Sequence, residues 1–271
     1  MKEITGATRV FGIVADPVAQ VRTPQVLNAY FEQEGLDAVL VPLHVAKDGL
    51  EAAFKAFRHL RNLGGFIVTV PHKADILKLC DEVSDAARAI GAANAVRREA
   101  DGRLVADMFD GRGFVEGLKA EGHSPAGKSV LLLGAGGAAA AIAHALALAG
   151  VGRLSIANRT RSKAQEIVER VQAAVPGANV QAADADPRGY DIVVNATSLG
   201  MKEGDALPLD VSLLSPANLV AEIIMKPEMT ALLQAAQEQG CRIHLGRHML
   251  DHQVRLMGRF MTGQPLDDKQ A

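Results

Sequence analysis

The segment that most restricts the fold is an apolar run that leads directly into a glycine-rich loop. Leu131-Leu132-Leu133 is followed by Gly134-Ala135-Gly136-Gly137-Ala138-Ala139, and an alanine-rich stretch continues to position 149. A buried strand that turns sharply into a helix needs glycine at the turn and a small residue where the helix packs on the strand. The pattern Gly134-x-Gly136-x-x-Ala139 therefore predicts a strand, a nucleotide-binding turn and a helix in that order.

The rest of the chain repeats this alternation of short β-branched runs and longer amphipathic stretches, which indicates an α/β fold with largely parallel sheets. Strands are predicted at 10–14, 38–45, 66–70, 129–133, 154–157, 191–194, 219–224 and 242–245. Helices are predicted at 24–34, 49–61, 113–121, 138–149, 162–174, 228–239 and about 249–261. Asp101-Gly102 lies between two further runs, 93–98 and 103–108, and predicts a hairpin.

This organisation predicts two lobes. Residues 1–110 would form an α/β substrate-binding lobe, completed by a C-terminal helix over 247–271 that follows the nucleotide-binding unit and packs back on the first lobe. Residues 111–246 would form a Rossmann-like dinucleotide-binding lobe with a parallel sheet. A cleft between two such lobes is the default place for a small-molecule ligand.

Composition excludes several classes of protein. The chain has 271 residues, 48% of them apolar and 22% charged, with a net charge of −2, which is typical of soluble globular proteins. We expect no nucleic-acid partner, because no basic block is present, and no membrane partner, because no apolar run approaches roughly 18 residues. The N-terminus lacks an apolar signal core, which favours the cytoplasm. Cys80 and Cys241 are too far apart in sequence to suggest a metal pair or a disulfide framework.

The end of the second strand in the nucleotide-binding lobe predicts which dinucleotide is bound. An NAD site usually places Asp or Glu there to accept hydrogen bonds from the ribose. This chain instead has Asn158-Arg159-Thr160-Arg161-Ser162-Lys163. Guanidinium and ammonium groups suit a 2′-phosphate, which a carboxylate would repel, so NADP is predicted rather than NAD. The competing interpretation is an ordinary solvated helix start.

A lysine and an aspartate are the candidates for proton transfer. Pro71 lacks an amide hydrogen and ends the predicted strand, which leaves His72 and Lys73 beyond it. Asp110 follows later, in a predicted loop. Interconversion of a carbonyl and an alcohol needs a proton donor at the oxygen, and a lysine tuned by a carboxylate or by burial can provide it. Taken alone, Lys73 would more often be a surface lysine, and His72 is expected to be structural.

Seven segments in this order resemble the shikimate dehydrogenase family over nearly the whole chain. They are Val68–Lys73, Gly91–Val96, Asp110–Phe114, Leu133–Ala138, Asn158-Arg159-Thr160, Asn195-Ala196-Thr197 with Gly200-Met201, and Met249-Leu250 with His252-Gln253. The resemblance implies NADP-linked interconversion of 3-dehydroshikimate and shikimate, with an N-terminal substrate lobe and a Rossmann lobe.

The resemblance also implies residue roles. Lys73 would be the catalytic acid/base, assisted by Asp110, and Thr23, Thr69, Asn94 and Gln253 would bind the cyclic hydroxy acid. The cofactor positions would be Gly134, Ala135, Gly136, Gly137, Ala138, Asn158, Arg159, Thr160, Lys163, Thr197, Ile223, Gly246 and Met249, the last near the nicotinamide. No metal is implied, and the protein would be a monomer or a homodimer.

Several positions depart from the family pattern. Typical members carry Ser-x-Ser-Pro after the first strand, whereas this chain has Val21-Arg22-Thr23-Pro24, so only the hydroxyl of Thr23 is kept. One charge-assisted hydrogen bond is worth roughly 1.5–3 kcal/mol. Arg22 could replace the lost donor only if it pointed the same way as Thr23, which strand-like alternation opposes. Met225, His248 and Phe109 stand where tyrosine, glycine and threonine are usual. We expect the reaction type to survive these changes, whereas the substrate stays open.

Three alternatives are weighed on these residues. The lost serine and tyrosine would suit a relative that acts on quinate or an amino-substituted shikimate. A non-catalytic sensor of a dinucleotide and a carbocyclic acid would have no need of the pair Lys73 and Asp110. A metal ladder of His244, His248 and His252 is disfavoured, because His244 is expected to end a strand and zinc sites need three or four convergent ligands.

Overall fold

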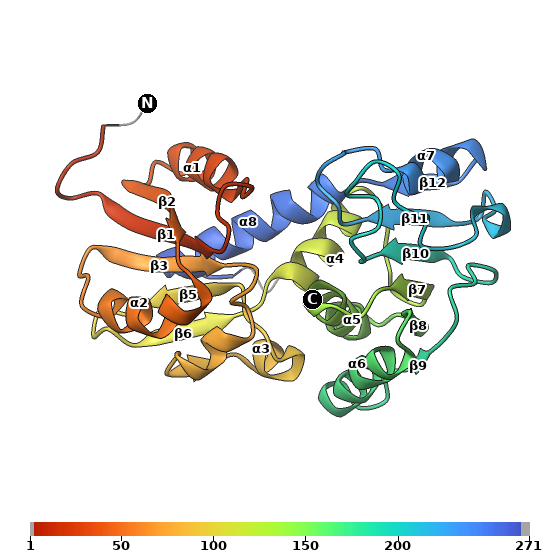
Figure 1. Cartoon of the computed structure of the whole chain (residues 1–271), viewed down its shortest axis with the longest axis horizontal. Coiled ribbons are helices and arrows are strands. Elements are labelled where there is room, and N and C mark those ends of the chain that lie inside the picture. The colour runs from red at the N-terminus through yellow and green to blue at the C-terminus, as the bar shows by residue number, and fades with distance from the viewer. Residues whose placement is uncertain (1–2, 267–271) are drawn as a thin grey trace. The chain divides into compact units, whose positions relative to one another are not determined.

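The computed structural model describes residues 3–266, which form two compact units (Figure 1). The first unit comprises the chain up to Phe109 and the segment from Gln253 onward, and the second runs from Asp110 to His252. Each unit is built on one six-stranded sheet. Within residues 3–266, no helix is both long and apolar enough to cross a bilayer.

The sheet of the first unit has the order β2-β1-β3-β5-β6-β4. Strand β1 (Arg9–Ala15) lies parallel to β2 (Ala38–His44) on one side and to β3 (Leu63–Val68) on the other. The predicted hairpin is confirmed, since β5 (Ala95–Arg98) and β6 (Leu104–Asp107) pair antiparallel around Gly102, whose φ is +91°. Strand β5 is antiparallel to β3, and the short β4 (Glu82–Val83) completes the edge beside β6.

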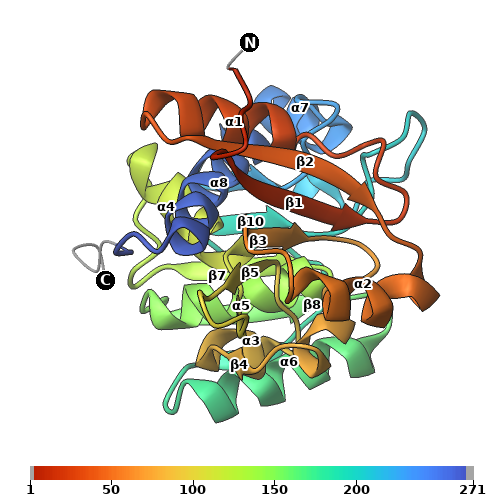
Figure 2. The same ribbon diagram turned by 90° about the vertical axis from the view of Figure 1, so that its left-hand side faces the viewer.

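Helices cover this sheet and supply its apolar core. They are α1 (Thr23–Gln33), α2 (Leu50–Phe57), α3 (Asp85–Ile90) and the second part of α8 (Gly246–Thr262), with 3₁₀ turns η1 (Lys47–Gly49) and η2 (Asp75–Lys78). Figure 2 shows α1 lying along β2. Phe11, Phe31, Phe54 and Phe66 are fully buried, and the edge-on packing of Phe54 against Phe66, with ring centroids 4.8 Å apart, ties α2 to β3.

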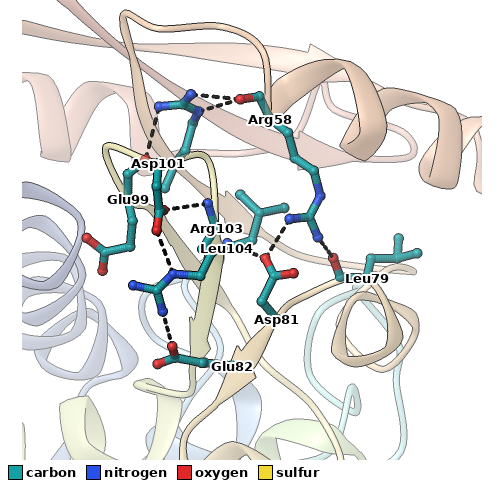
Figure 3. Close-up of polar contacts among 9 residues, drawn as sticks. Arg58, Leu79, Asp81, Glu82, Glu99, Asp101, Arg103 and Leu104 are labelled. Atoms are coloured by element: carbon teal, nitrogen blue, oxygen red, sulfur yellow. Dashed lines mark hydrogen bonds and ion pairs between the residues drawn. The ribbon is translucent and has the colours of Figure 1, made fainter.

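Salt bridges connect the segment that precedes α3 both to the hairpin and to the end of α2. Arg58 pairs with Asp81 at 2.5 Å, while Arg103 pairs with both Glu82 and Asp101 (Figure 3). The carbonyl of Arg58 accepts further hydrogen bonds from the hairpin. Each of these two arginines therefore faces at least one carboxylate.

The sheet of the second unit is entirely parallel and has the order β12-β11-β10-β7-β8-β9. Its strands are β7 (Ser129–Leu133), β8 (Arg153–Ala157), β9 (Val180–Ala182), β10 (Ile192–Asn195), β11 (Leu219–Glu222) and β12 (Arg242–His244). Helices α4 (Asp110–Ala120), α5 (Gly137–Leu148), α6 (Arg161–Ala174), α7 (Ala231–Glu238) and the start of α8 accompany them, with a 3₁₀ turn η3 (Val211–Leu213). Counted from β7, this is the strand order 3-2-1-4-5-6 of the Rossmann fold, so the predicted fold class is confirmed.

Some predicted boundaries are wrong. Helix α2 ends at Phe57 rather than 61, and β3 spans Leu63–Val68 rather than 66–70, because two buried glycines, Gly64 and Gly65, hide the start of the strand. Asp110 lies in the first turn of α4 and not in a loop, where its charge suits the helix N-terminus. The two-residue β4, the six-residue α3 and the three-residue β9 were not predicted, since such short elements carry little periodicity.

Helices α4 and α5 approach so closely that only glycine fits at position 111. A Cβ atom placed on Gly111 would lie 2.0 Å from the carbonyl oxygen of Ala141, which belongs to the backbone of α5. We expect Gly111→Ala to lower the free energy of unfolding by about 1–3 kcal/mol, because the two helices must move apart. Chemical denaturation measures the loss, with Gly6→Ala as control because a Cβ there would meet nothing within 4 Å. Equal stability of both variants would contradict this packing.

Candidate active site

The glycine turn after β7 packs closely against a neighbouring turn of the second unit. Gly134 has φ of +112°, and a Cβ atom on it would lie 2.8 Å from the carbonyl oxygen of Ala196. Ala196 follows β10, the strand beside β7, so two turns meet where the direction of strand order reverses. By contrast, Cβ atoms on Gly136 and Gly137 would meet nothing within 4 Å. Backbone is therefore exposed at the point where parallel sheets bind ligands.

A cleft of about 640 Å³ opens at this edge, along the carboxyl ends of β7, β8 and β10. Eight of the predicted cofactor residues line it, namely Gly134, Ala135, Gly136, Asn158, Arg159, Thr160, Lys163 and Thr197. Gly137 and Ala138 lie in the adjoining first turn of α5. The volume is in the range of small-molecule sites, and its walls combine backbone, hydroxyl and cationic groups.

Two helices begin at this cleft without a side-chain cap. Gly136 is the N-cap of α5 and Thr160 is the N-cap of α6, and neither helix receives a capping hydrogen bond from its N-cap side chain. In contrast, Ser84 and Thr230 cap α3 and α7 with their hydroxyls. The first amide groups of a helix lack intrahelical acceptors, so α5 and α6 offer N–H donors and partial positive charge to an anion.

Two cations at the cleft have no counter-charge in the described part of the chain. Neither Arg159 nor Lys163 forms an ion pair among residues 3–266, and both are exposed. The neighbouring Arg161 pairs with Asp184 at 3.2 Å, while the amide of Asn158 donates to the carbonyl of Thr160 at 2.9 Å. A pyrophosphate at the glycine turn and a 2′-phosphate at Arg159 and Lys163 would both meet suitable donors, so the residues present fit NADP.

Several lining residues were missed from the sequence, among them Asp184, Ser198, Leu199 and Pro208. Asp184 follows β9, and the short length of that strand hid it. Ser198 and Leu199 follow the predicted Asn195-Ala196-Thr197 segment directly. The rule that ligands lie beyond the carboxyl ends of parallel strands would have located those two residues.

A buried glutamate holds the turns that follow β10 and β11. Glu222 is 0% exposed and accepts hydrogen bonds from Asn195 Nδ2 at 3.0 Å and Thr230 Oγ1 at 3.0 Å. It also accepts from the backbone amides of Ile223 and Ile224. Burial raises the pKa of this carboxyl, whereas the four donors favour the ionised form. Asn195 Oδ1 in turn accepts from the Thr197 hydroxyl at 2.7 Å, which positions Thr197 at the cleft.

Three predicted cofactor positions in the second unit lie outside the lining of this cleft. Ile223 and Gly246 belong to the turn after β11 and the start of α8, and Met249 is buried in the first turns of that helix. A Cβ atom on Gly246 would lie 2.3 Å from the carbonyl oxygen of Ile224, so glycine is required for α8 to begin there.

The predicted acid/base follows β3 in the first unit. Lys73 is half-buried, and its carbonyl accepts a hydrogen bond from Ala93 N at 2.8 Å, which fixes this turn beside β5. The preceding His72 is fully buried and its Nε2 lies 2.8 Å from the carbonyl oxygen of Val45, so it is structural as predicted. Thr69 is also half-buried, and its amide donates to Val14.

Other predicted substrate residues lie in less expected surroundings. Asn94 is buried and its Oδ1 accepts from the amide of Phe109 at 2.9 Å, so part of its amide group serves the backbone. Asp110, which follows Phe109 in sequence, begins the second unit and is 2% exposed. Gln253 begins the returning segment of the first unit within α8 and is half-buried. Thr23 is the first residue of α1.

Two family models match the chain. Residues 13–96 match the shikimate dehydrogenase substrate binding domain, and residues 118–201 match shikimate / quinate 5-dehydrogenase. Shikimate dehydrogenase (NADP(+)) of Geobacter metallireducens is 40% identical over 269 residues, which covers 96% of this chain and 93% of that protein. The chain belongs to the shikimate dehydrogenase family.

Two solved structures match nearly the whole length of the chain. Shikimate 5-dehydrogenase from Listeria monocytogenes, in complex with shikimate and NAD, is 34% identical with a TM-score of 0.91, covering 98% of this chain and 96% of that one. The 5-ketofructose reductase of a Gluconobacter strain is 35% identical with a TM-score of 0.88, covering 96% and 95%. Relatives of similar identity thus carry different substrate names.

The departures from the shikimate dehydrogenase pattern have structural settings. Arg22 is the N-cap of α1 with helical φ and ψ, so the segment before Thr23 is not the alternating strand on which its direction was predicted. Arg22 is exposed, and Val21 is half-buried. Met225 is 39% exposed beyond β11. Phe109 is buried and packs on Phe260 with ring centroids 5.3 Å apart, which explains an aromatic residue at that position.

His248 belongs to an aromatic cluster within the second unit. Its Nδ1 lies 3.2 Å from Glu121 Oε1, and its ring centroid lies 4.8 Å from that of His244, which also contacts Phe114 and His123. His244 ends β12, as predicted, and is 1% exposed, and neither of its ring nitrogens has a hydrogen-bond partner within residues 3–266. Among the described residues, no group of three or more His, Cys, Asp or Glu is arranged to hold a metal.

The buried ring of His244 makes stability depend on pH. Burial, with smaller contributions from His248, His123 and His252, lowers the pKa of His244 from 6.5 to about 3. The folded state keeps this ring neutral, while the unfolded chain takes up a proton below pH 6.5. The contribution of the neutral ring to the free energy of unfolding is therefore complete above pH 6.5 and is lost as the pH falls toward 3. When the pH falls from 7 to 5, the free energy of unfolding of wild type should therefore decrease by up to about 2 kcal/mol more than that of His244→Leu.

Urea denaturation of both proteins at the two pH values measures this difference, and His59→Leu, at an exposed surface position, is the control. If wild type and His244→Leu lose the same stability on acidification, His244 is not held neutral in the folded state.

Proposed function

We propose that this chain is an NADP-dependent shikimate dehydrogenase, which interconverts 3-dehydroshikimate and shikimate. The observation that carries the proposal is a glycine turn at the reversal of a Rossmann sheet, flanked by Arg159 and Lys163, two cations that form no ion pair with any described residue. Family membership and relatives named shikimate dehydrogenase (NADP(+)) support the same activity.

In this proposal the second unit holds the cofactor. The amides at the start of α5 would bind the pyrophosphate, and Arg159, Thr160 and Lys163 would bind the 2′-phosphate. Ile223, Gly246 and Met249 would lie along the nicotinamide end. Bound NADP supplies or accepts the hydride. Because Glu222 and Asn195 hold the turns after β10 and β11, the cofactor would enter a preformed surface.

The proton is handled by residues of the chain. Lys73 would give a proton to the carbonyl oxygen during reduction and take it from the hydroxyl during oxidation. Its half-buried position after β3, with a backbone hydrogen bond to Ala93, supports a fixed orientation. Asp110 would orient the ammonium group and accept a hydrogen bond from a substrate hydroxyl. Its burial at the start of α4 supports a functional carboxylate rather than a surface one.

The first unit would bind the cyclic hydroxy acid through Thr23, Thr69, Asn94 and Gln253. Val21 supplies no hydroxyl for the substrate carboxylate, and Met225 supplies none beyond β11. These two positions, together with a 5-ketofructose reductase among relatives of similar identity, favour a second candidate. In this second candidate function, the same chemistry acts on quinate, an amino-substituted shikimate or another polyhydroxylated ring or chain.

We also propose that the protein is cytoplasmic and is a monomer or a homodimer.

Lys73→Met tests the acid/base, since the substitution removes the ammonium group and keeps the length of the side chain. We expect kcat for shikimate oxidation with NADP⁺ to fall by about 10²–10⁴-fold, the usual contribution of general acid–base catalysis. Absorbance of the reduced cofactor reports the rate. Lys78→Met, at an exposed position of η2, is the control and should keep wild-type activity.

The wild-type assay decides among the candidates. Comparison of kcat/KM for shikimate, quinate, an amino-substituted shikimate and fructose identifies the substrate class. Calorimetric binding of both ligands without hydride transfer would favour a non-catalytic sensor and would refute the proposed activity.

Cofactor choice is tested separately with Arg159→Ala. Loss of one charge-assisted hydrogen bond to the 2′-phosphate should raise KM for NADP⁺ by about 10–100-fold and leave KM for NAD⁺ nearly unchanged. Arg188→Ala is a matched control, because Arg188 is exposed in the same unit and pairs with Asp186. An equal increase for both dinucleotides would show that Arg159 does not read the 2′ position.

A further inference from the structure

A second, strongly basic pocket lies in the first unit. It has a volume of about 460 Å³ and is lined by Arg9, Arg61, Arg97, Arg98, Glu99 and the last turn of α8. Arg9 begins β1 and Arg61 precedes β3, while Arg97 and Arg98 end the antiparallel β5. Val10 pairs with Leu63, and Gly65 pairs with Arg97, so the four arginines gather at one end of the sheet.

This end is opposite to the one from which the predicted catalytic segment leaves. Thr69 and Lys73 follow the carboxyl end of β3, whereas the pocket lies at its amino end. The cofactor cleft belongs to the other unit altogether. The basic pocket is therefore part of neither proposed binding surface.

The charges in this pocket are not balanced. Four guanidinium groups face one carboxylate, which leaves three positive charges among the lining residues. Arg97 pairs with Glu99 at 2.6 Å, but Arg9, Arg61 and Arg98 form no ion pair within residues 3–266. Nearby, Arg58 and Arg103 each face at least one carboxylate (Figure 3). Like charges that converge without counter-ions repel one another, so an anion would stabilise this arrangement.

Three of the guanidinium groups are held in place before any ligand arrives. The Arg9 group lies over the ring of Phe11 at 5.3 Å from its centroid, and the Arg97 group lies over Phe260 at 4.9 Å. Arg98 donates to the carbonyl of Arg58 through Nε and Nη2, at 3.1 and 2.7 Å. Donors that are already oriented lose little conformational entropy when they bind an anion.

Contacts within the protein account for only some of the four arginines. The carbonyl end of α8 attracts cations, and Arg97 Nη1 lies 3.5 Å from the carbonyl oxygen of Phe260. Arg98 joins the hairpin to the residues after α2. Within residues 3–266, no hydrogen bond of this kind engages the side chain of Arg61 or Arg9, and the Arg9 group lies over an aromatic face beside Gly64. Two of the four arginines are thus left for a ligand.

We propose that this pocket is a binding site for a small phosphate-bearing anion. The planar, forked donors of arginine match the oxygen geometry of phosphoryl groups. A multiply charged phosphate or pyrophosphate would neutralise the three uncompensated charges, and the volume is in the range of small-molecule sites.

Isothermal titration calorimetry of the full-length protein with inorganic pyrophosphate at low ionic strength tests the site. We expect Arg9→Gln and Arg61→Gln each to raise Kd by about tenfold, because each removes one charge-assisted contact. Arg88→Gln, an exposed arginine of the same unit, should keep the wild-type Kd, and so should the wild-type protein whose cofactor cleft is saturated with NADP⁺. Pyrophosphate binding that persists in the presence of saturating NADP⁺ separates this site from the proposed cofactor site.

Parallel titrations with inorganic phosphate and ADP distinguish a free phosphate from a nucleotide source, and binding of either that Arg9→Gln and Arg61→Gln weaken supports the site. The proposal is overturned if the wild-type protein binds none of the three, or if Kd is the same in Arg9→Gln, Arg61→Gln and wild type. Citrate binding as tightly as pyrophosphate would overturn the assignment to phosphate.

Discussion

The close approach of two backbone turns at Gly134 is the constraint on which the second unit depends. A positive φ and a carbonyl oxygen 2.8 Å from any added Cβ leave glycine as the residue that fits. Because these turns follow adjacent parallel strands, their contact fixes where the strand order reverses. The start of α5, the exposed Gly136 and the cleft along β7, β8 and β10 all follow from that point.

Polar groups around this turn divide into those that shape the cleft and those left for a ligand. The carboxylate of Glu222 accepts hydrogen bonds from four internal donors, and the side-chain amide of Asn195 donates to Glu222 and accepts from Thr197. Arg161 is engaged with Asp184. Arg159 and Lys163 have no such partner in the described chain, and α5 and α6 lack side-chain caps. Cationic side chains and backbone amide donors that lie together at one surface indicate an anionic ligand. A phosphorylated dinucleotide is such a ligand.

Much of the fold was predictable because its signals are local. The apolar run at β7 was predicted residue for residue, and the Asp101-Gly102 hairpin was confirmed. Predictions were wrong where local signals are weak. Glycines hid the start of β3 and the first turn of α4, so Asp110 was placed in a loop. The three-residue β9 was missed, and with it Asp184. The direction of the Arg22 side chain was predicted from strand-like alternation, but Arg22 is the N-cap residue of α1.

The sequence by itself determined the fold class, the family and the chemistry of the predicted cofactor positions, because each depends on residue types at short, fixed spacings. Only the tertiary structure revealed which polar residues are already engaged within the protein, such as Asn94 with Phe109 and His248 with Glu121. It also brought Arg9, Arg61, Arg97 and Arg98 to one end of a sheet. Hydrogen bonding and charge balance depend on contacts between residues far apart in the chain, and no local pattern records those contacts.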